Sequence, residues 1–183
     1  MPGAAPILAG AAAMLAALSA PAAAQIVPGT RAPETTAELV GDAQMVVCFL
    51  AAAGRPMPGL NMPLLGEEGM TVLTQVPDPL ARLVENRADQ AILELKSPAD
   101  PVWIVHDRST RRCAIYALTD PAPVEAKLMP ILLGGSHPWR RVEAGAGVDQ
   151  AFALKLGRER FLTEISRPRA AGEPLLVVVR PGR

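Results

Sequence analysis

Aromatic side chains, histidine and cysteine are all scarce in this chain of 183 residues. Phe, Trp and Tyr together make up 3% of it, and it has two histidines and two cysteines. Neither sign of charge is in excess, because 18 Lys and Arg balance 18 Asp and Glu. A protein that binds the phosphate backbone of a nucleic acid needs a surplus of basic residues, so the balance of charge argues against that function. The apolar content of 50% in turn argues against a disordered chain.

Charged residues are missing altogether from positions 1–24. The apolar run from Ile7 to Leu18 is broken by Ser19-Ala20-Pro21, and Ala22-Ala23-Ala24 supplies small residues for a signal peptidase. We therefore predict a signal peptide over 1–24 with cleavage before Gln25, although its start lacks a basic side chain. The run is shorter than the ~20 residues of a membrane span, and no later stretch is longer. A periplasmic or secreted bacterial protein is expected, not membrane-spanning once the leader is removed.

The two cysteines, Cys48 and Cys113, form an even set in a chain predicted to be exported, where thiols oxidise. A structural disulfide between them is expected. Closing the long loop between them should stabilise the fold by about 4 kcal/mol on the chain-entropy model. The alternatives are two independently buried thiols or a redox pair. The CxxC spacing that would favour redox chemistry is absent.

Helical and strand-like segments follow a loose arm at 25–34. Thr35 and Glu38 form a capping-box pattern, which predicts a helix that ends at Gly54. The second half of this helix, which contains Cys48, is apolar on every side and is expected to be buried. Two further helices are predicted, over 78–87 and 120–134. Pro130 is expected to kink or end the last one. Strands are expected over 91–95, 102–105, 113–118, 139–144, 148–156, 160–166 and 174–180.

The short connections between these strands favour antiparallel neighbours. The sequence therefore predicts an α+β fold in which a mainly antiparallel sheet packs with two or three helices and carries one disulfide. A single domain is expected over 35–183. Two weakly similar halves are visible, each a helix followed by strands, but their sequences do not match well enough to define a repeat. The segment 67–73 has an ambiguous pattern.

Any histidine-dependent chemistry must use His106 or His137. His106 precedes Asp107, with Ser109 just beyond, but adjacent strand residues point to opposite faces, so a catalytic triad is disfavoured. Ser136 and His137 follow two glycines, which would let a ligand approach the backbone closely. The simpler interpretation is that the glycines end a helix. The three residues His106, Ser136 and His137 are kept as candidate ligand-site residues, and no catalytic residue is assigned.

No metal site and no cofactor are predicted. The sequence lacks H-x-x-x-H, CxxC, the phosphate-binding loop G-x-x-x-x-G-K-[ST] and the dinucleotide motif G-x-G-x-x-G. Arginine is the one enriched charge, and several arginines on one sheet face could bind an anionic ligand or an acidic partner. The competing interpretation is that interleaved acids cancel them. These arginines are Arg108, Arg111, Arg112, Arg140, Arg141, Arg158, Arg160, Arg167 and Arg169.

A helix with one cysteine and a later strand with the second, as in Arg112-Cys113-Ala114-Ile115-Tyr116, resembles small exported alphaproteobacterial proteins of uncharacterised function. The resemblance spans most of the mature chain and implies no catalytic residue. The leading hypothesis is a soluble periplasmic binding or accessory module without catalytic activity, whose partner is a periplasmic protein or a small ligand. The alternatives are an envelope hydrolase that uses Ser136 and His137, or a small-ligand carrier with an apolar pocket between helices and sheet.

Overall fold

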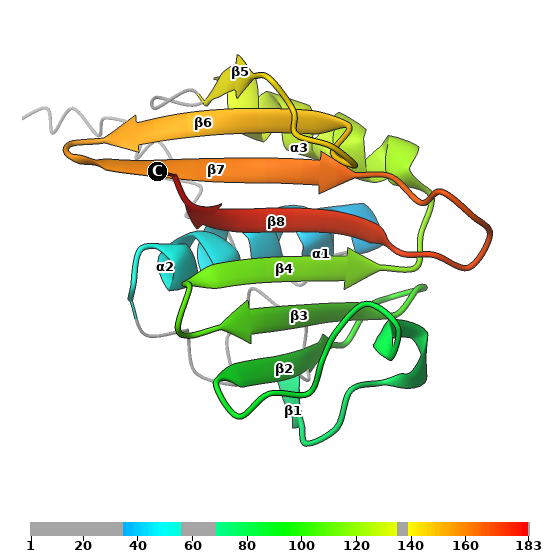
Figure 1. Cartoon of the computed structure of the whole chain (residues 1–183). Helices are drawn as coiled ribbons and strands as arrows, with labels where there is room; N and C mark the ends of the chain where they lie inside the picture. Colours follow the sequence, from blue (N-terminus) through cyan, green and yellow to red (C-terminus); the bar gives the residue numbers. More distant parts are fainter. Residues whose placement is uncertain (1–34, 56–68, 135–138, 183) are drawn as a thin grey trace, which may run out of the picture.

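The computed structural model describes residues 35–55, 69–134 and 139–182, in which helical segments precede each group of strands (Figure 1). The helical elements are α1 (Thr36–Asp42), the π-helical η1 (Ala43–Cys48), α2 (Phe49–Ala52), the 3-10 turn η3 (Asp78–Leu80) and α3 (Pro121–Gly134). The strands are β1 (Met70–Leu73), β2 (Gln90–Leu95), β3 (Val102–Asp107), β4 (Arg112–Ala117), β5 (Arg140–Val142), β6 (Gln150–Leu156), β7 (Glu159–Ser166) and β8 (Leu175–Pro181).

All eight strands join one sheet in the order β1-β2-β3-β4-β8-β7-β6-β5, and every neighbouring pair is antiparallel. Each half of the chain is a helical segment followed by a four-stranded meander. The last strands of the two meanders, β4 and β8, pair with each other and join the halves. The expectation of a mainly antiparallel sheet with helices packed on it is confirmed, and the molecule is dominated by the sheet.

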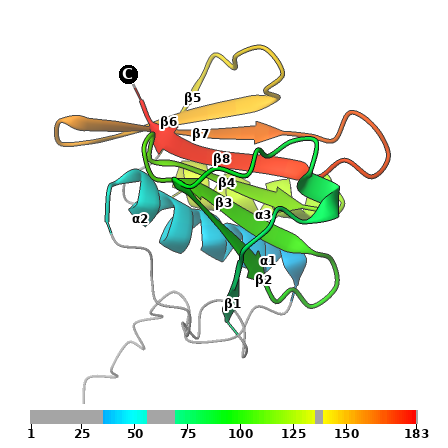
Figure 2. The same ribbon diagram turned by 60° about the horizontal axis from the view of Figure 1, so that its bottom comes forward.

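The helices α1, α2 and α3 cover one face of the sheet (Figure 2). This arrangement follows from the sequence, because alternate strand residues and the inner sides of the helices are apolar. Fully buried side chains from both layers meet there, among them Leu39, Val47, Ile115, Leu128 and Val177. The space between helices and sheet is therefore occupied by packed side chains.

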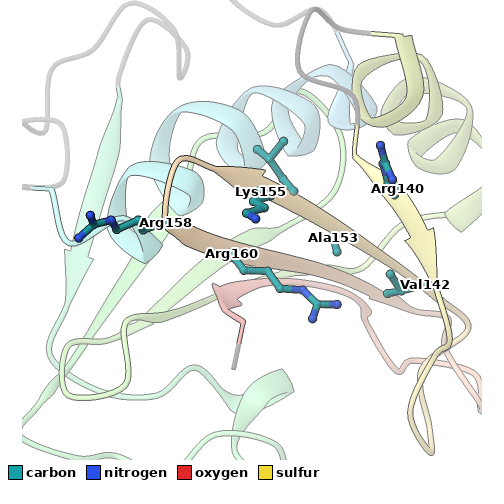
Figure 3. Close-up of a pocket in the computed structure, with 7 residues that line it drawn as sticks. Arg140, Val142, Ala153, Lys155, Arg158 and Arg160 are labelled. Carbon is teal, nitrogen blue, oxygen red and sulfur yellow. The ribbon is translucent and has the colours of Figure 1, made fainter.

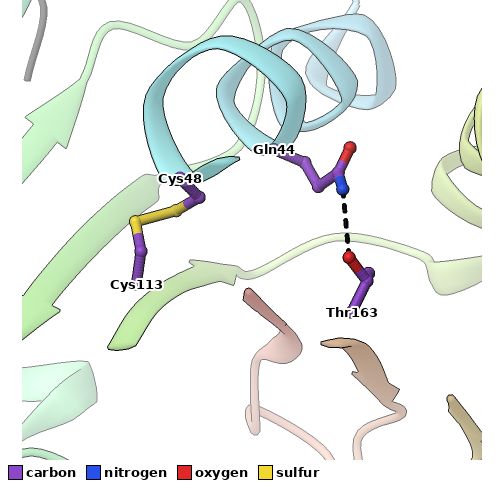
Figure 4. The surroundings of a disulfide bond; sticks show 4 residues. All are labelled: Gln44, Cys48, Cys113 and Thr163. Carbon is purple, nitrogen blue, oxygen red and sulfur yellow. Dashed lines mark hydrogen bonds between the residues drawn. A yellow bond between two sulfur atoms is a disulfide. The ribbon is translucent and has the colours of Figure 1, made fainter. Parts of the chain in front are cut away.

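Two contacts attach the first helical segment to both halves of the sheet (Figure 4). Cys48 of η1 and Cys113 of β4 form the predicted disulfide, with Cα atoms 5.1 Å apart and 65 residues apart in sequence. One helical turn earlier, Gln44 donates a hydrogen bond from Nε2 to Oγ1 of Thr163 on β7 at 3.2 Å. Both cysteines, Gln44 and Thr163 have no exposed surface. The first helix is thus held to a strand of each meander.

The opposite face of the sheet is covered over the first half of the chain. There the β1–β2 connection, residues 74–89, crosses the strands (Figure 1). Its side chains Leu80 and Val84 pack on Trp103 and Tyr116 in a second apolar cluster. Full burial of a leucine such as Leu80 stabilises a fold by roughly 1.5–3 kcal/mol. Among the described residues, the second half has no comparable cover, because its β5–β6 connection spans only 143–149.

One helix prediction was wrong in extent, and the helix predicted over 120–134 is observed as α3, Pro121–Gly134. The helix expected over 78–87 is only the short turn η3, after which the chain continues irregularly. Leu83, which would lie on the apolar side of such a helix, is 51% exposed, so too few buried contacts stabilise a longer helix. Of the two effects expected of Pro130, a kink or the end of the helix, the second does not occur, because α3 continues to Gly134. Val124, Leu128 and Leu132 bury one face of α3 across the proline, and this packing outweighs the missing hydrogen bond.

Among the residues that the structure describes, no helix has the length and apolar character needed to cross a membrane.

Candidate functional site

Many of the arginines predicted as a candidate patch are held by acidic or amide side chains. The nitrogen–oxygen distances are 3.8 Å for Arg111–Glu159, 3.0 Å for Arg141–Gln150, 2.6 Å for Arg167–Glu125 and 2.9 Å for Arg169–Asp149. Exposed pairs of this kind each contribute ~0–1 kcal/mol to the free energy of unfolding. At Arg111, Arg167 and Arg169 an acid offsets the basic charge, as one of the two interpretations predicted, whereas the partner of Arg141 is a neutral amide.

The basic side chains near the turn between β6 and β7 behave differently, because they line one pocket (Figure 3). The pocket has a volume of about 700 Å³, which is within the ~300–1,000 Å³ usual for ligand sites. Its lining residues are Arg140, Val142, Ala153, Leu154, Lys155, Arg158 and Arg160. Four of the seven are basic and none is acidic.

Strand register places three of these cations on one face. Arg140 on β5 pairs with Ala153 on β6, and Lys155 on β6 lies directly opposite Arg160 on β7. Because strand residues alternate between faces, Ala153 and Lys155 point the same way, away from the helices that bury their neighbours. Figure 3 shows Arg158 at the turn, Arg140 at the other end of the pocket, and Lys155 and Arg160 between them.

The acids nearest in sequence to these cations are engaged elsewhere. Glu159 pairs with Arg111, and Glu164 accepts hydrogen bonds from Nε and Nη2 of Arg180 at 3.0 and 2.6 Å. The bonds from Glu164 raise the pKa of Arg180. Within the described part of the chain, no acidic side chain pairs with any of the four cations of the pocket. The pocket therefore combines a positive potential with exposed, forked donors suited to phosphate, sulfate or carboxylate groups.

The prediction named Arg140, Arg158 and Arg160 among the candidate arginines but missed Lys155. The signal was present, because Lys155 and Arg160 are symmetrically placed about the turn Gly157-Arg158. In a tight hairpin such positions face each other. Gly157 has a φ of 59°, which favours glycine at this turn.

His106 lies apart from the pocket, on β3. Its register partner on β4 is Cys113, and its Nε2 is buried without a hydrogen-bond partner among the described residues. Burial lowers the pKa of His106, and the nearby charge of Arg108 lowers it further. Asp107 lies on the opposite face of the strand, where Arg87 of the β1–β2 connection pairs with it. In the described part of the chain, no carboxylate or hydroxyl group is hydrogen-bonded to the His106 imidazole.

Asp107 instead organises the β3–β4 turn. Its Oδ1 accepts hydrogen bonds from the Ser109 hydroxyl at 2.8 Å and the Thr110 N–H at 3.0 Å, while Arg87 pairs with Oδ2. Burial alone would raise the pKa of Asp107. The bonds from Thr110 and Ser109, together with Arg87, outweigh it and lower that pKa to about 2. Ser109 is thus a turn hydroxyl and lies away from His106.

The other two candidates, Ser136 and His137, lie outside the described residues. A further hydroxyl cluster joins Thr36 at the start of α1 to the β2–β3 turn. The Thr36 and Ser97 hydroxyl oxygens are 3.0 Å apart, and Thr36 donates to Asp100 at 3.4 Å. These contacts attach the start of α1 to the β2–β3 turn.

In the described ranges, no group of three or more His, Cys, Asp or Glu side chains is placed to hold a metal ion. The basic pocket is therefore the candidate functional site on which the geometry converges. Comparison of the chain with protein-family models, with curated proteins and with solved structures finds no match.

Proposed function

We propose that this chain is an exported, non-catalytic binding module whose ligand surface is the basic pocket of β5, β6 and β7. The observation that carries the proposal is the set of four cations, Arg140, Lys155, Arg158 and Arg160, around one pocket without an acidic partner among the described residues. The chain as a whole is neutral, so this concentration of charge is local. Local charge of one sign raises the concentration of oppositely charged ligands at a surface.

The buried disulfide supports an extracytosolic site of action, since such bonds persist where thiols oxidise. Together with the charge-free segment 1–24, it favours the periplasm or the exterior of a bacterial cell. The resemblance to small exported two-cysteine proteins points the same way. Sequencing the amino terminus of the protein recovered from a periplasmic extract should find Gln25 first. Recovery from the cytosol with Met1 still present would overturn this part of the proposal.

The binding role is tested by retention on phosphocellulose at pH 7 and low salt. A neutral chain is retained there only if its cations are clustered, so we expect retention of the natural protein and elution by salt. The double variant Arg140→Gln/Arg160→Gln should elute at distinctly lower salt. The matched control Arg82→Gln/Arg108→Gln removes two exposed charges outside the pocket and should elute only slightly earlier than the natural protein. Equal elution of the two double variants would overturn the proposed function.

A further inference from the structure

The arrangement of the four cations specifies the shape of the ligand, an inference that rests on the proposed function. We propose that the basic pocket binds a linear oligoanion, laid across β5, β6 and β7, whose phosphate, sulfate or carboxylate groups repeat along a non-peptide chain. Such a chain comes from a polyphosphate or from an acidic glycan. The proposal depends on the cross-strand register, the spacing of the charges and the chemistry of the lining.

Lys155 and Arg160 form a like-charge pair directly across β6 and β7. Both side chains are exposed, and no described acid lies between them. Like charges opposite each other on a sheet repel and destabilise the pairing. An anionic group that bridges the two side chains removes this repulsion, so the pair is better suited to a bound state than to the free protein. This pair marks the position of one anionic group of the ligand.

Arg140 marks a second position. It lies opposite Ala153, which is two residues from Lys155 on the same strand. That separation is about 7 Å along β6, and with one inter-strand spacing the Cα atoms of Arg140 and Lys155 are about 8 Å apart. In Figure 3 the guanidinium groups of Arg140 and Arg160 are directed away from each other. One small anion cannot contact both Arg140 and the Lys155–Arg160 pair, whereas an oligoanion with two or more charged groups can.

The spread of charge over three strands also argues against an acidic peptide added to the edge of the sheet. β5 is the edge strand, so an added strand would lie about 14 Å from Arg160 on β7. Of the four cations, only Arg140 would lie close enough to contact such a peptide. A ligand that crosses the strands on the face reaches all of them. Ala153 lies beside Arg140 and two residues from Lys155, so its small aliphatic side chain suits an uncharged spacer. The described lining holds no aromatic ring on which a base could stack.

The residue that follows β8, Gly182, positions the backbone and the side chain of Arg160. The N–H of Gly182 donates to the carbonyl of Arg160 at 2.7 Å, and a Cβ added at Gly182 would lie 2.8 Å from Arg160 Cγ. The missing side chain of Gly182 thus leaves room for the stem of Arg160. Gly182 is a positioning residue, and Gly182→Ala should weaken ligand binding without removing any charge.

The test is calorimetric titration of the whole protein at low salt with four probes: inorganic phosphate, tripolyphosphate, a sulfated heparin tetrasaccharide and hexaglutamate. At least one of the two non-peptide oligoanions should bind about tenfold or more tightly than phosphate and than hexaglutamate. Tight binding of tripolyphosphate alone identifies a phosphate chain, and tight binding of the tetrasaccharide alone identifies a glycan; either supports the proposal. If phosphate or hexaglutamate binds as tightly as the oligoanions, the proposal is overturned while the binding function survives. If the double variant Arg140→Gln/Arg160→Gln binds every probe with the same affinity as the natural protein, both the oligoanion proposal and the proposed binding function are overturned.

The variant Lys155→Glu separates a binding role from a structural one. It converts the like-charge pair into an attractive pair with Arg160, so we expect a higher melting temperature than in the natural protein. The same variant should lose tenfold or more in affinity for the oligoanion. A surface lysine with no role in binding would leave the affinity unchanged, and that result would overturn the proposal.

Discussion

At the residue scale, the neighbours His106 and Asp107 show how strand alternation separates two groups that look paired in the sequence. His106 points to the helix side and Asp107 to the side of the β1–β2 connection. Both have a lowered pKa, His106 through burial and Asp107 through the hydrogen bonds of the turn and Arg87, which outweigh its own burial. In each case the unfolded chain takes up its proton at a higher pH than the folded chain. Both groups therefore make the fold less stable as the pH falls.

The contribution of Asp107 belongs to a definite pH window. Its pKa is about 2 in the folded protein against an ordinary value of 3.8, so its stabilisation is complete above pH 3.8 and is lost as the pH falls towards 2. Asp107→Asn should cost on the order of 1 kcal/mol at pH 7, because the bonds to Thr110 and Ser109 weaken. It should also flatten the decline of stability with acid in this window. Urea unfolding between pH 7 and pH 2 measures both effects, and an unchanged acid slope would contradict the assignment.

At the scale of elements, the sequence predicted what depends on local pattern. The Thr35 cap is confirmed, since Thr35 Oγ1 accepts the Glu38 N–H at 3.1 Å. The hairpin of β3 and β4 and the strands of the second half lie close to their predicted bounds, because alternation and turn residues are local signals. The segment 67–73 was ambiguous, and within it Met70–Leu73 forms β1. A strand this short is defined by its partner β2, which the local pattern does not reveal.

Pro130 is the clearest case in which tertiary packing outweighed local preference. It is exposed in the middle of α3, so it contributes little packing while it removes a helical hydrogen bond. Pro130→Ala should therefore raise the free energy of unfolding by about 1–2 kcal/mol, after allowance for the greater freedom of the unfolded chain. Chemical denaturation measures the change.

Pro123 in the first turn of the same helix provides the matched control. Its missing N–H would have no partner within the helix in any case, so Pro123→Ala should change stability much less. If both substitutions have equal effects, the missing hydrogen bond at Pro130 is not what limits α3.

At the scale of the whole molecule, the two halves share an architecture but differ in what covers them. The connection 74–89 lies over the first meander, while the same face of the second meander carries Arg140, Lys155 and Arg160. The sequence indicated the two halves, and it offered a shared face of arginines only as one of two interpretations. It did not predict that β8 pairs with β4, or which face would be left uncovered, because both depend on contacts between residues far apart in the chain.

The disulfide was predictable from the sequence because only two cysteines are present, and it is a covalent link between the first helical segment and the sheet. It links η1 to β4, near the middle of the sheet. The double variant Cys48→Ala/Cys113→Ala should lower the free energy of unfolding by about 4 kcal/mol, mainly because the unfolded chain regains freedom. The free energy of unfolding of a typical domain is only ~5–15 kcal/mol, so this loss should lower the denaturant concentration at the unfolding midpoint strongly. Guanidinium unfolding of the oxidised protein and the variant measures the difference.

Single substitutions distinguish a covalent link from the packing of two separate sulfur atoms. If the link provides the stability, Cys48→Ala and Cys113→Ala should each cost nearly as much as the double variant, because either one opens the same loop. If instead each sulfur contributes through its own buried contacts, the two losses should add up to that of the double variant. Reduction of the unfolded natural protein before refolding should reproduce the loss seen in the double variant, because it opens the loop without removing an atom from the core.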